Sequence, residues 1–568
     1  MTYVQSPPRL GNEYEDDLVL RGYLRRRLPA ELRAEIEPEL RELGGLSGGP
    51  LYALQQADQA REPVHVPWDA WGNRVDRIEL TAVWLEAERL AAERGIVATP
   101  YERRHGRYSR IHGLALAYLF TPSTDFYGCP LAMSDGAAKI LSLPDTPVAL
   151  KERALPRLLT RDPARFWTSG QWMTELPGGS DVSRTETEAR RDADGTWRLY
   201  GRKWFTSAVA SQMALALARP EGAPAGSRGL ALFYLETRDA EGRPNALYVN
   251  RLKDKLGTRK LPTAELALEG VPAAMIGGVG EGVKRIAPML NLTRTWNTMT
   301  AAALLGRGLR LARDYAGRRE VFGRLLRDQP LHADTLLGVE AEWAGSLLLA
   351  FRLAEGLGLV EGSPDDVATD GEGDGAGATA SAADEAALLR VLTPIAKLTT
   401  GRQVVAGAAE LVEAFGGAGY IEDTGLPALV RDAQVLSIWE GTTNVLALEA
   451  LRGLQRVGGL EVIQGEAVRC AAVVHDPALA LLAGRACDAL HAASAWLEAA
   501  SAQGEDVVQA GARRFALQLG RAVELMLLLE HAQWALDTEG DEYPAALARR
   551  FAAHGVAPIF AEETVGAS

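Results

Sequence analysis

The spacing of apolar residues divides this sequence into zones of different character. Near the start, the stretch from Ile78 to Leu90 carries apolar residues three and four positions apart, which is typical of an amphipathic helix. We therefore predict that residues 1–165 are mainly helical. A zone of short apolar runs follows, and helical spacing then returns for the rest of the chain.

The zone of short apolar runs, residues 166–280, is predicted to be a β domain. Its strand candidates are Thr196–Tyr200, Met213–Ala218 and Leu230–Leu235. The dipeptides Asp194-Gly195 and Glu221-Gly222 lie beside these runs and are typical of turns. This pattern predicts a β domain inserted between helical ones.

Long amphipathic patterns return after the β zone. The helix candidates there are Arg307–Arg319, Glu385–Glu413 and Ala510–Asp537. Between the first two, residues 361–384 are rich in Asp, Gly, Ala and Ser, and Val367 is their only large apolar residue. Such a segment cannot bury enough surface to offset its ordering entropy, so we predict a mobile acidic loop.

Together these patterns predict an α+β fold with several domains. The parts are an N-terminal helical domain (1–165), a central β domain (166–280), a C-terminal helical bundle (281–450) and an additional helical domain (451–568). A chain of 568 residues with 47% hydrophobic residues can bury large cores, which favours a multi-domain enzyme.

The charge of the chain disfavours broad nucleic-acid binding, because the formal net charge is -13. From Leu446 onward there are 9 arginines, no lysine and 16 acidic residues. Arg513, Arg514 and Arg521 could form one basic face, but a solvated helix face is the preferred interpretation. The charge therefore disfavours DNA as a partner, but it does not exclude binding at a local basic patch.

Other features of the composition indicate a cytoplasmic protein. The first residues turn acidic early and lack the apolar core of a signal peptide. No uninterrupted apolar run approaches the roughly 18 residues of a membrane span. The three cysteines, Cys129, Cys470 and Cys487, are scattered and predicted to be buried thiols, and we predict no metal site.

Three short segments carry the candidate chemistry. In Trp172–Val182, the adjacent glycines Gly178 and Gly179 let the backbone approach a planar or anionic ligand, and Thr174 and Ser180 offer hydroxyl groups. An ordinary turn with a helix cap would show the same residues, so this segment alone leaves both interpretations open.

The second segment, Gly201–Ser207, places Trp204 and Phe205 in a predicted strand, where aromatic residues are usually core. Combined with the first segment, they suit the flat apolar wall that a flavin requires. The third segment, Ser437–Asn444, holds Glu440 between Trp439 and a glycine. A carboxylate there suits an acid beside a cofactor, but an isolated Glu-Gly-Thr would more often be a solvated loop.

In their order and separations, these segments resemble motifs of the acyl-CoA dehydrogenase family. The resemblance covers roughly residues 75–450. It rests on MTE-LPGGSDV, KWFTS, RREVFGRLLRDQ, EAFGGAGY and IWEGT, read alongside LVRDA. Within the family, the extra C-terminal zone, the PWDAWG segment and the LKDKLG segment resemble the AidB-like subgroup.

The resemblance implies FAD as cofactor and assigns residues to it. Met173 and Thr174 would meet the pyrimidine edge, and Ser180 would reach the pyrophosphate. Gly179 would also contact the cofactor, and Trp204, Phe205 and Thr206 would line the isoalloxazine ring. A neighbouring subunit would add Arg319, Phe322, Gln329, Gly416 and Gly417, and Thr442 and Asn444 would touch the cofactor again. The implied assembly is a homotetramer, a dimer of dimers.

The resemblance also implies the substrate, an acyl-CoA thioester. Glu440 would be the catalytic base, and Ser180, Asn291 and Arg294 would lie on the substrate side. Two departures weaken particular contacts. Asn291 replaces the Asp of an Asp-x-x-Arg pair, which puts a contact to CoA in doubt, and Glu413 replaces an uncharged amide near the FAD adenosine.

The implied reaction is α,β-dehydrogenation, in which a base takes the α-proton while the flavin accepts the β-hydride. Electrons would pass to an electron-transferring flavoprotein or to dioxygen. Two alternatives stay open: an AidB-like, DNA-associated protective flavoprotein with weak catalysis, and a flavin oxidase of a non-CoA substrate such as a nitroalkane. The presence of Glu440 disfavours the second alternative.

Overall fold

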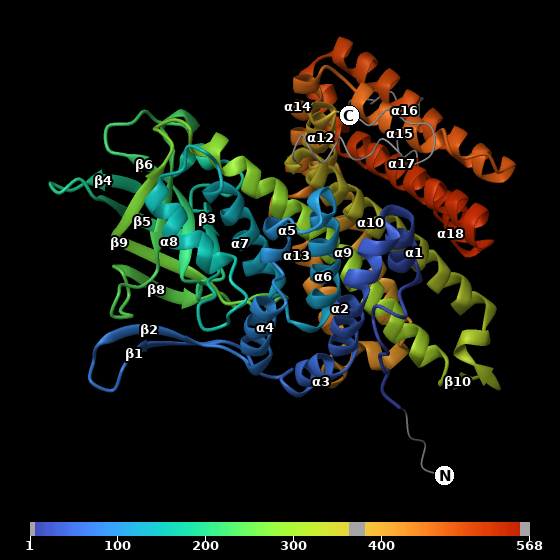
Figure 1. Cartoon of the computed structure of the whole chain (residues 1–568), viewed down its shortest axis with the longest axis horizontal. Helices are drawn as coiled ribbons and strands as arrows, with labels where there is room; N and C mark the ends of the chain where they lie inside the picture. The colour runs from blue at the N-terminus through green and yellow to red at the C-terminus, as the bar shows by residue number, and fades with distance from the viewer. Residues whose placement is uncertain (1–5, 363–380, 557–568) are drawn as a thin grey trace, which may run out of the picture. The chain divides into compact units, whose positions relative to one another are not determined.

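The computed structural model describes residues 6–362 and 381–556 (Figure 1). Its contacts group the chain into two compact units. The β-containing unit comprises Leu51–Glu102 and Ser123–Trp296. The helical unit comprises Met1–Pro50, Arg103–Pro122 and Asn297–Ser568.

The β-containing unit is built on a seven-stranded sheet. Its strands are β3 (Ser169–Trp172), β4 (Glu188–Arg191), β5 (Trp197–Ser207), β6 (Met213–Pro220), β7 (Ala231–Glu236), β8 (Leu247–Leu252) and β9 (Thr263–Ile276). The pairing order is β3-β6-β4-β5-β9-β7, and because β6 also pairs with β7, five strands form a closed circuit. Trp172, Leu199 and Phe233 lie at the core of this sheet, each fully buried.

The three strands predicted from the sequence are confirmed as β5, β6 and β7. The turns at Gly195 and Gly222 also form, and both glycines adopt positive φ angles (86° and 80°) that L-residues rarely reach. The short helices of this unit are α4 (Ala82–Glu93), α5 (Ala98–Glu102), α7 (Gly128–Leu141) and α8 (Val148–Leu158).

The helix predicted over Ile78–Leu90 is wrong in its first part. Strands β1 (Val64–Trp68) and β2 (Arg74–Glu79) form an antiparallel hairpin, and Ile78 belongs to β2. The helix starts only at Ala82, after Thr81 accepts a hydrogen bond from the Trp84 amide at 3.4 Å. Ile78 and Leu80 are two positions apart, which is the spacing of apolar residues in a strand. Because their positions also fit the helical spacing of the apolar residues in α4, the sequence pattern did not separate the two elements.

The helical unit is a bundle of long helices. Its members are α1 (Leu18–Arg27), α2 (Ala30–Gly48), α6 (Ser109–Phe120), α10 (Pro330–Glu361), α12 (Ala382–Glu413), α13 (Pro427–Val435), α14 (Thr443–Val457), α15 (Glu461–Ala471), α16 (Pro477–Gln503), α17 (Glu505–Glu539) and α18 (Tyr543–Ala553). Helix α3 (Pro50–Ala57) begins at Pro50, and its other residues belong to the β-containing unit. Helix α9 (Gly282–Ala316) belongs to the β-containing unit up to Trp296 and to the helical unit from Asn297 onward.

The predicted long helices lie within α9, α12 and α17, although α9 ends at Ala316. Figure 1 shows α17 alongside α10 and α12, and a glycine permits the close contact with α12: a Cβ on Gly520 would lie 2.1 Å from Thr399 Oγ1. Of the predicted acidic loop 361–384, the two ends belong to helices, and residues 363–380 lie outside the described residues.

The structure also bears on two smaller predictions, the burial of the cysteines and the absence of a membrane span. Only Cys470 is buried, whereas Cys129 and Cys487 are half-buried, so the prediction of three buried thiols is wrong for two of them. Among the described residues, α10 alone is long and apolar enough to cross a membrane, and 78% of its most apolar window is buried inside the fold. A core helix of a globular bundle has the same composition.

Glu13 forms a buried ion pair in the helical unit. Arg307 donates to both carboxylate oxygens of Glu13 at 2.7 Å, and Ser47 and Arg310 add further hydrogen bonds. Burial raises the pKa of Glu13, but Arg307 and Arg310 outweigh it, and the pKa falls from 4.5 to about 2. A lowered folded-state pKa stabilises the fold above the unfolded-state value and loses that stabilisation as the pH falls.

We therefore expect Glu13 to contribute about 3 kcal/mol of stability that disappears between pH 4.5 and pH 2. Urea unfolding of the wild type and of Glu13→Gln across this range should give free energies that converge as the pH falls. The exposed Glu15→Gln is the matched control and should run parallel to the wild type. Parallel curves for Glu13→Gln as well would contradict this assignment.

Candidate active site

The loop that follows β3 in the β-containing unit holds the first group of predicted site residues. Met173 and Thr174 are half-buried, and Gly179 and Ser180 are exposed. The Thr174 carbonyl accepts from the Trp204 amide at 3.0 Å, which joins this loop to β5. A Cβ on Gly179 would come no closer than 3.8 Å to Thr174, so the loop backbone is open to a ligand there.

A buried ion pair, which the sequence analysis did not single out, holds this loop in place. The Lys203 ammonium donates to Glu175 Oε1 at 2.6 Å and to the Leu217 carbonyl at 2.8 Å. Glu175 also accepts from the Thr187 hydroxyl at 2.6 Å. Lys203 is 1% exposed and Glu175 4% exposed. Burial lowers the pKa of Lys203, and the Glu175 carboxylate opposes that effect.

Trp204 and Phe205 are placed as an accessible aromatic surface rather than as core. Phe205 is 54% exposed, and the two rings meet edge to face with centroids 6.3 Å apart. The Lys253 ammonium lies 3.3 Å from the Trp204 ring centroid and is held by Glu265 at 2.7 Å. Thr206 differs from them, since it is fully buried and its hydroxyl donates to the Ala264 carbonyl at 2.5 Å.

Two of the three predicted substrate-side residues, Asn291 and Arg294, lie on α9, whereas Ser180 lies in the loop after β3. Asn291 is exposed, and its carbonyl accepts from the Thr295 hydroxyl at 3.0 Å. Arg294 is 5% exposed. A polar cluster lies next to Thr295 in the sequence: Trp296 donates to Asp135 at 2.9 Å, and Tyr101 donates to the same carboxylate at 2.7 Å.

In the helical unit, Glu440 occupies a strained turn between α13 and α14. Its φ of 55° lies in the left-handed region, which non-glycine residues seldom adopt and which costs on the order of 1–3 kcal/mol. Gly441 follows at φ 103°. Such strain persists only when surrounding contacts fix it, and it gathers at functional sites.

Those contacts come from helices distant in the sequence. Lys397 on α12 is fully buried, and its ammonium donates to the Gly441 carbonyl at 2.7 Å. The Trp439 indole donates to the Asn297 side-chain oxygen, and the Asn297 amide donates to the Leu436 carbonyl at 3.1 Å. The turn that carries Glu440 is therefore fixed on both sides.

The two predicted cofactor residues after this turn lie at the start of α14. Thr442 is its N-cap and accepts from the Val445 amide at 3.5 Å. Asn444 is exposed and accepts from Arg513 on α17 at 3.1 Å. The additional C-terminal helices thus reach the edge of the predicted site.

A second group of predicted cofactor residues surrounds a small hairpin after α9. Phe322 is fully exposed at φ 49°, and Gly323 follows at φ 79°, the conformation of a two-residue hairpin turn. The hairpin joins β10 (Glu320–Val321) to β11 (Arg324–Leu325), and the Gln329 amide donates to the Val321 carbonyl at 2.9 Å. Arg319, just before it, is half-buried.

Gly416 and Gly417 lie after α12, and a Cβ on either would meet only open space. The Tyr315 and Phe415 rings, 5.1 Å apart, link the end of α9 to this glycine segment. Glu413 is exposed at the end of α12. In the helical unit, the structure thus places the predicted residues in two groups, the Glu440 turn and the hairpin with the glycines. In the β-containing unit they lie in the loop after β3, on β5 and, for Asn291 and Arg294, on α9.

The arginines considered for a basic face do not behave alike. Arg521 donates to Glu342 at 2.9 Å and lies over the Phe551 ring, so it is a half-buried ion-pair residue and not part of a solvated face. Arg513 is exposed and donates to Asn444. The prediction of a solvated trio is therefore wrong for Arg521.

The chain thus folds as a β domain between helical segments, with a strained glutamate between two helices of the bundle. The chain matches the middle domain of acyl-CoA dehydrogenases over residues 170–271 and their C-terminal domain over 280–370 and 376–455. Residues 5–162 match the N-terminal domain of the adaptive response protein AidB, and 467–567 match the C-terminal domain of acyl-CoA dehydrogenase 11.

The relatives agree with these domain matches. The chain is 43% identical over 459 residues to acyl-CoA dehydrogenase family member 11 of Caenorhabditis elegans (79% of this chain, 72% of the relative). It is 31% identical over 415 residues to the putative acyl-CoA dehydrogenase AidB of Escherichia coli (71% of each). The chain therefore belongs to the acyl-CoA dehydrogenase family, a family of oxidoreductases, and to its AidB-like branch.

Among solved structures, that of Caenorhabditis elegans ACDH-11 in complex with C11-CoA is similar over 99% of this chain and 94% of that chain. The TM-score is 0.91 at 37% identity. The predicted fold class, including the additional C-terminal helical domain, is thereby confirmed.

Proposed function

We propose that this protein is an FAD-dependent dehydrogenase of acyl-CoA thioesters and that Glu440 is its catalytic base. The observation that carries the proposal is the strained conformation of Glu440, fixed by Lys397 and Asn297. A carboxylate held rigidly in one place suits a group that must meet one particular proton. The ACDH-11 relative, whose structure contains C11-CoA, supports a thioester substrate.

The described residues fit an extended flavin dinucleotide. Phe205 presents an accessible aromatic face, and the loop from Met173 to Ser180 offers backbone amides and the hydroxyls of Thr174 and Ser180 beside an open glycine. Thr206 contributes its backbone only, because its hydroxyl is already used inside the sheet. The fully exposed Phe322 and the open glycines suit contacts that a neighbouring subunit makes with the cofactor.

In the proposed reaction Glu440 takes the proton from the carbon next to the thioester carbonyl. Exclusion of water by the acyl chain strengthens a carboxylate as a base. The backbone amide of Glu440 donates to the thioester oxygen as negative charge develops there. FAD, when bound, supplies the acceptor for the hydride that leaves the next carbon.

Assembly and electron transfer belong to the same proposal. We propose a cytoplasmic homotetramer that passes electrons to an electron-transferring flavoprotein or to dioxygen. We propose that Arg294 contacts the CoA moiety, whereas Asn291 lacks the charge of an Asp at that position. The alternative of a DNA-associated protective flavoprotein is weakened by Arg521, because its ion pair with Glu342 argues against a basic face on α17.

A product assay tests the proposed reaction. The purified, FAD-loaded protein is incubated with saturated acyl-CoA thioesters of increasing length, including the eleven-carbon compound, and an artificial electron acceptor. Mass spectrometry should show the loss of two hydrogens from one length class. Parallel assays under air alone and with an electron-transferring flavoprotein identify the acceptor. If no thioester is converted, the proposed function is wrong.

Replacing Lys397 by Met should slow catalysis without removing the base. The substitution keeps most of the side-chain volume but frees the Gly441 carbonyl, so Glu440 is no longer held in position. We expect the rate of flavin reduction to fall by about 10–100-fold, since a misplacement of about 1 Å can cost 10²-fold.

Two readouts separate positioning from unfolding in Lys397→Met. Near-ultraviolet circular dichroism and the flavin content should match the wild type, and the affinity for the thioester should change little. Arg390→Met, at an exposed position on the same helix, is the matched control. An unchanged rate in Lys397→Met would show that Lys397 does not position Glu440.

A further inference from the structure

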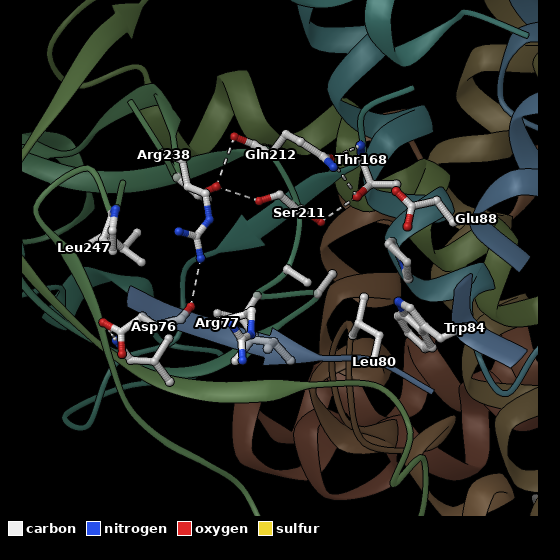
Figure 2. Close-up of a pocket in the computed structure, with 18 of the residues that line it drawn as sticks. Asp76, Arg77, Leu80, Trp84, Glu88, Thr168, Ser211, Gln212, Arg238 and Leu247 are labelled. Atoms are coloured by element: carbon white, nitrogen blue, oxygen red, sulfur yellow. Dashed lines mark hydrogen bonds between the residues drawn. The ribbon is translucent and has the colours of Figure 1, made fainter. Parts of the chain in front are cut away.

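A cavity of about 430 Å³ lies within the β-containing unit. It is walled by the β1–β2 hairpin and Leu80, by α4, by the start of α7, by the loop Ala208–Gln212 and by the segment between β7 and β8 (Figure 2). Its volume is within the range of small-molecule sites. Thr168, which lines it, precedes β3, whereas the predicted flavin loop follows the other end of that four-residue strand, about 13 Å away.

Glu88 on α4 is the acidic group at one end of this cavity. Figure 2 shows its carboxylate directed toward Thr168, on the same side as Trp84. Within residues 6–362 and 381–556, no group donates a hydrogen bond to Glu88 and no cation pairs with it. Burial raises the pKa of Glu88, and no neighbouring cation opposes that rise. A carboxylate in this position is stabilised by a cation that arrives from outside.

Aromatic rings surround the same end. Trp84 is 3% exposed and Tyr127 2% exposed, and both line the cavity with ring centroids 4.9 Å apart. Aromatic faces attract organic cations, by more when the cation is shielded from water. A carboxylate beside two rings therefore favours an ammonium group over a neutral or anionic one.

The opposite end of the cavity carries positive charge. The Arg238 guanidinium donates to the carbonyls of Val75, Asp76 and Gly242 at 2.9–3.3 Å, and Figure 2 shows it directed toward Asp76, away from Glu88. The Asp76 carboxylate is occupied by His65 at 2.7 Å and Arg74 at 2.9 Å. A cation is thus repelled from this end, which orients it toward Glu88.

The walls between the two ends include apolar side chains, among them Ile78, Leu80 and Val209. We propose that this cavity is a second ligand site, which binds a small organic ammonium ion with its nitrogen at Glu88 and its apolar body along these side chains. The site does not depend on the proposed dehydrogenase function, because none of the groups that form it is assigned to the flavin, to the thioester or to catalysis.

Calorimetric titration of the full chain with three aromatic probes of similar size tests the charge preference. The probes are benzylammonium, benzyl alcohol and benzoate. We expect saturable one-to-one binding of benzylammonium, and binding weaker by about tenfold or more for the other two, because only the cation pairs with Glu88. Equal affinity for benzyl alcohol, or no saturable heat with benzylammonium, would overturn the proposal.

Variants then locate the binding. Glu88→Gln keeps the shape of the side chain and should weaken benzylammonium binding by about tenfold or more. Leu80→Trp fills the cavity and should abolish binding of all three probes. Glu86→Gln, on the same helix but outside the cavity lining, is the control and should bind as the wild type does. If folded Leu80→Trp binds benzylammonium as the wild type does, the ammonium binds outside this cavity and the proposal is wrong. If Glu88→Gln does not fold, Leu80→Trp and the comparison of the three probes still test the proposal.

Discussion

Replacing Glu440 by Gln is expected to reduce the rate of flavin reduction by acyl-CoA by about 10²–10⁴-fold, the usual contribution of a general base. The amide has nearly the shape of the carboxylate, so the left-handed turn at φ 55° and its anchors on Lys397 and Asn297 should persist. Stopped-flow measurement under anaerobic conditions, with a single excess thioester, reads this rate directly.

The control for this prediction is a glutamate remote from the turn. Glu461→Gln, at the exposed start of α15, should reduce the flavin at the wild-type rate. Both variants should retain FAD to the same extent. A Glu440→Gln protein that reduces its flavin within about tenfold of the wild-type rate would show that the base is another residue.

The second large effect concerns the buried pair Lys203–Glu175. Replacing Lys203 by Met removes one partner and leaves a carboxylate 4% exposed without its cation. Breaking a buried pair in this way costs about 3–5 kcal/mol, so the free energy of unfolding should fall by that amount. Because Glu175 also holds the loop that carries Thr174, the variant should in addition lose flavin more readily.

A double substitution distinguishes the unpaired charge from lost packing. Lys203→Met combined with Glu175→Gln removes both charges, and it should recover a large part of the lost stability in a urea unfolding experiment. Arg190→Met, from an exposed pair on the same sheet, should cost less than about 1 kcal/mol. If the double variant were as unstable as Lys203→Met alone, packing and not the buried charge would explain the loss.

The sequence predicted the order of helical and β zones well, because strands such as Leu230–Leu235 are short continuous apolar runs, whereas α12 and α17 are helices of 32 and 35 residues. It failed where two patterns met. Ile78 lies in the β1–β2 hairpin and Leu80 just after it, and their alternation merges with the helical spacing of α4. Only the Thr81 cap separates the two patterns.

The candidate site was predicted as a set of motifs but not as a set of contacts. Lys203 and Lys397 were missed because lysines are ordinarily exposed, and nothing in the sequence shows that each meets a buried oxygen. The contact between Trp439 and Asn297 joins residues 142 positions apart, which no local spacing can reveal. The positive φ of Glu440 likewise depends on these distant anchors.

Anaerobic titration of the FAD-loaded wild-type protein with a series of acyl-CoA thioesters shows whether this protein oxidises them with Glu440 as the base. We expect one chain-length class to bleach the visible absorbance of the oxidised flavin. An absorbance spectrum unchanged by every thioester, in protein that retains its FAD, would contradict this expectation.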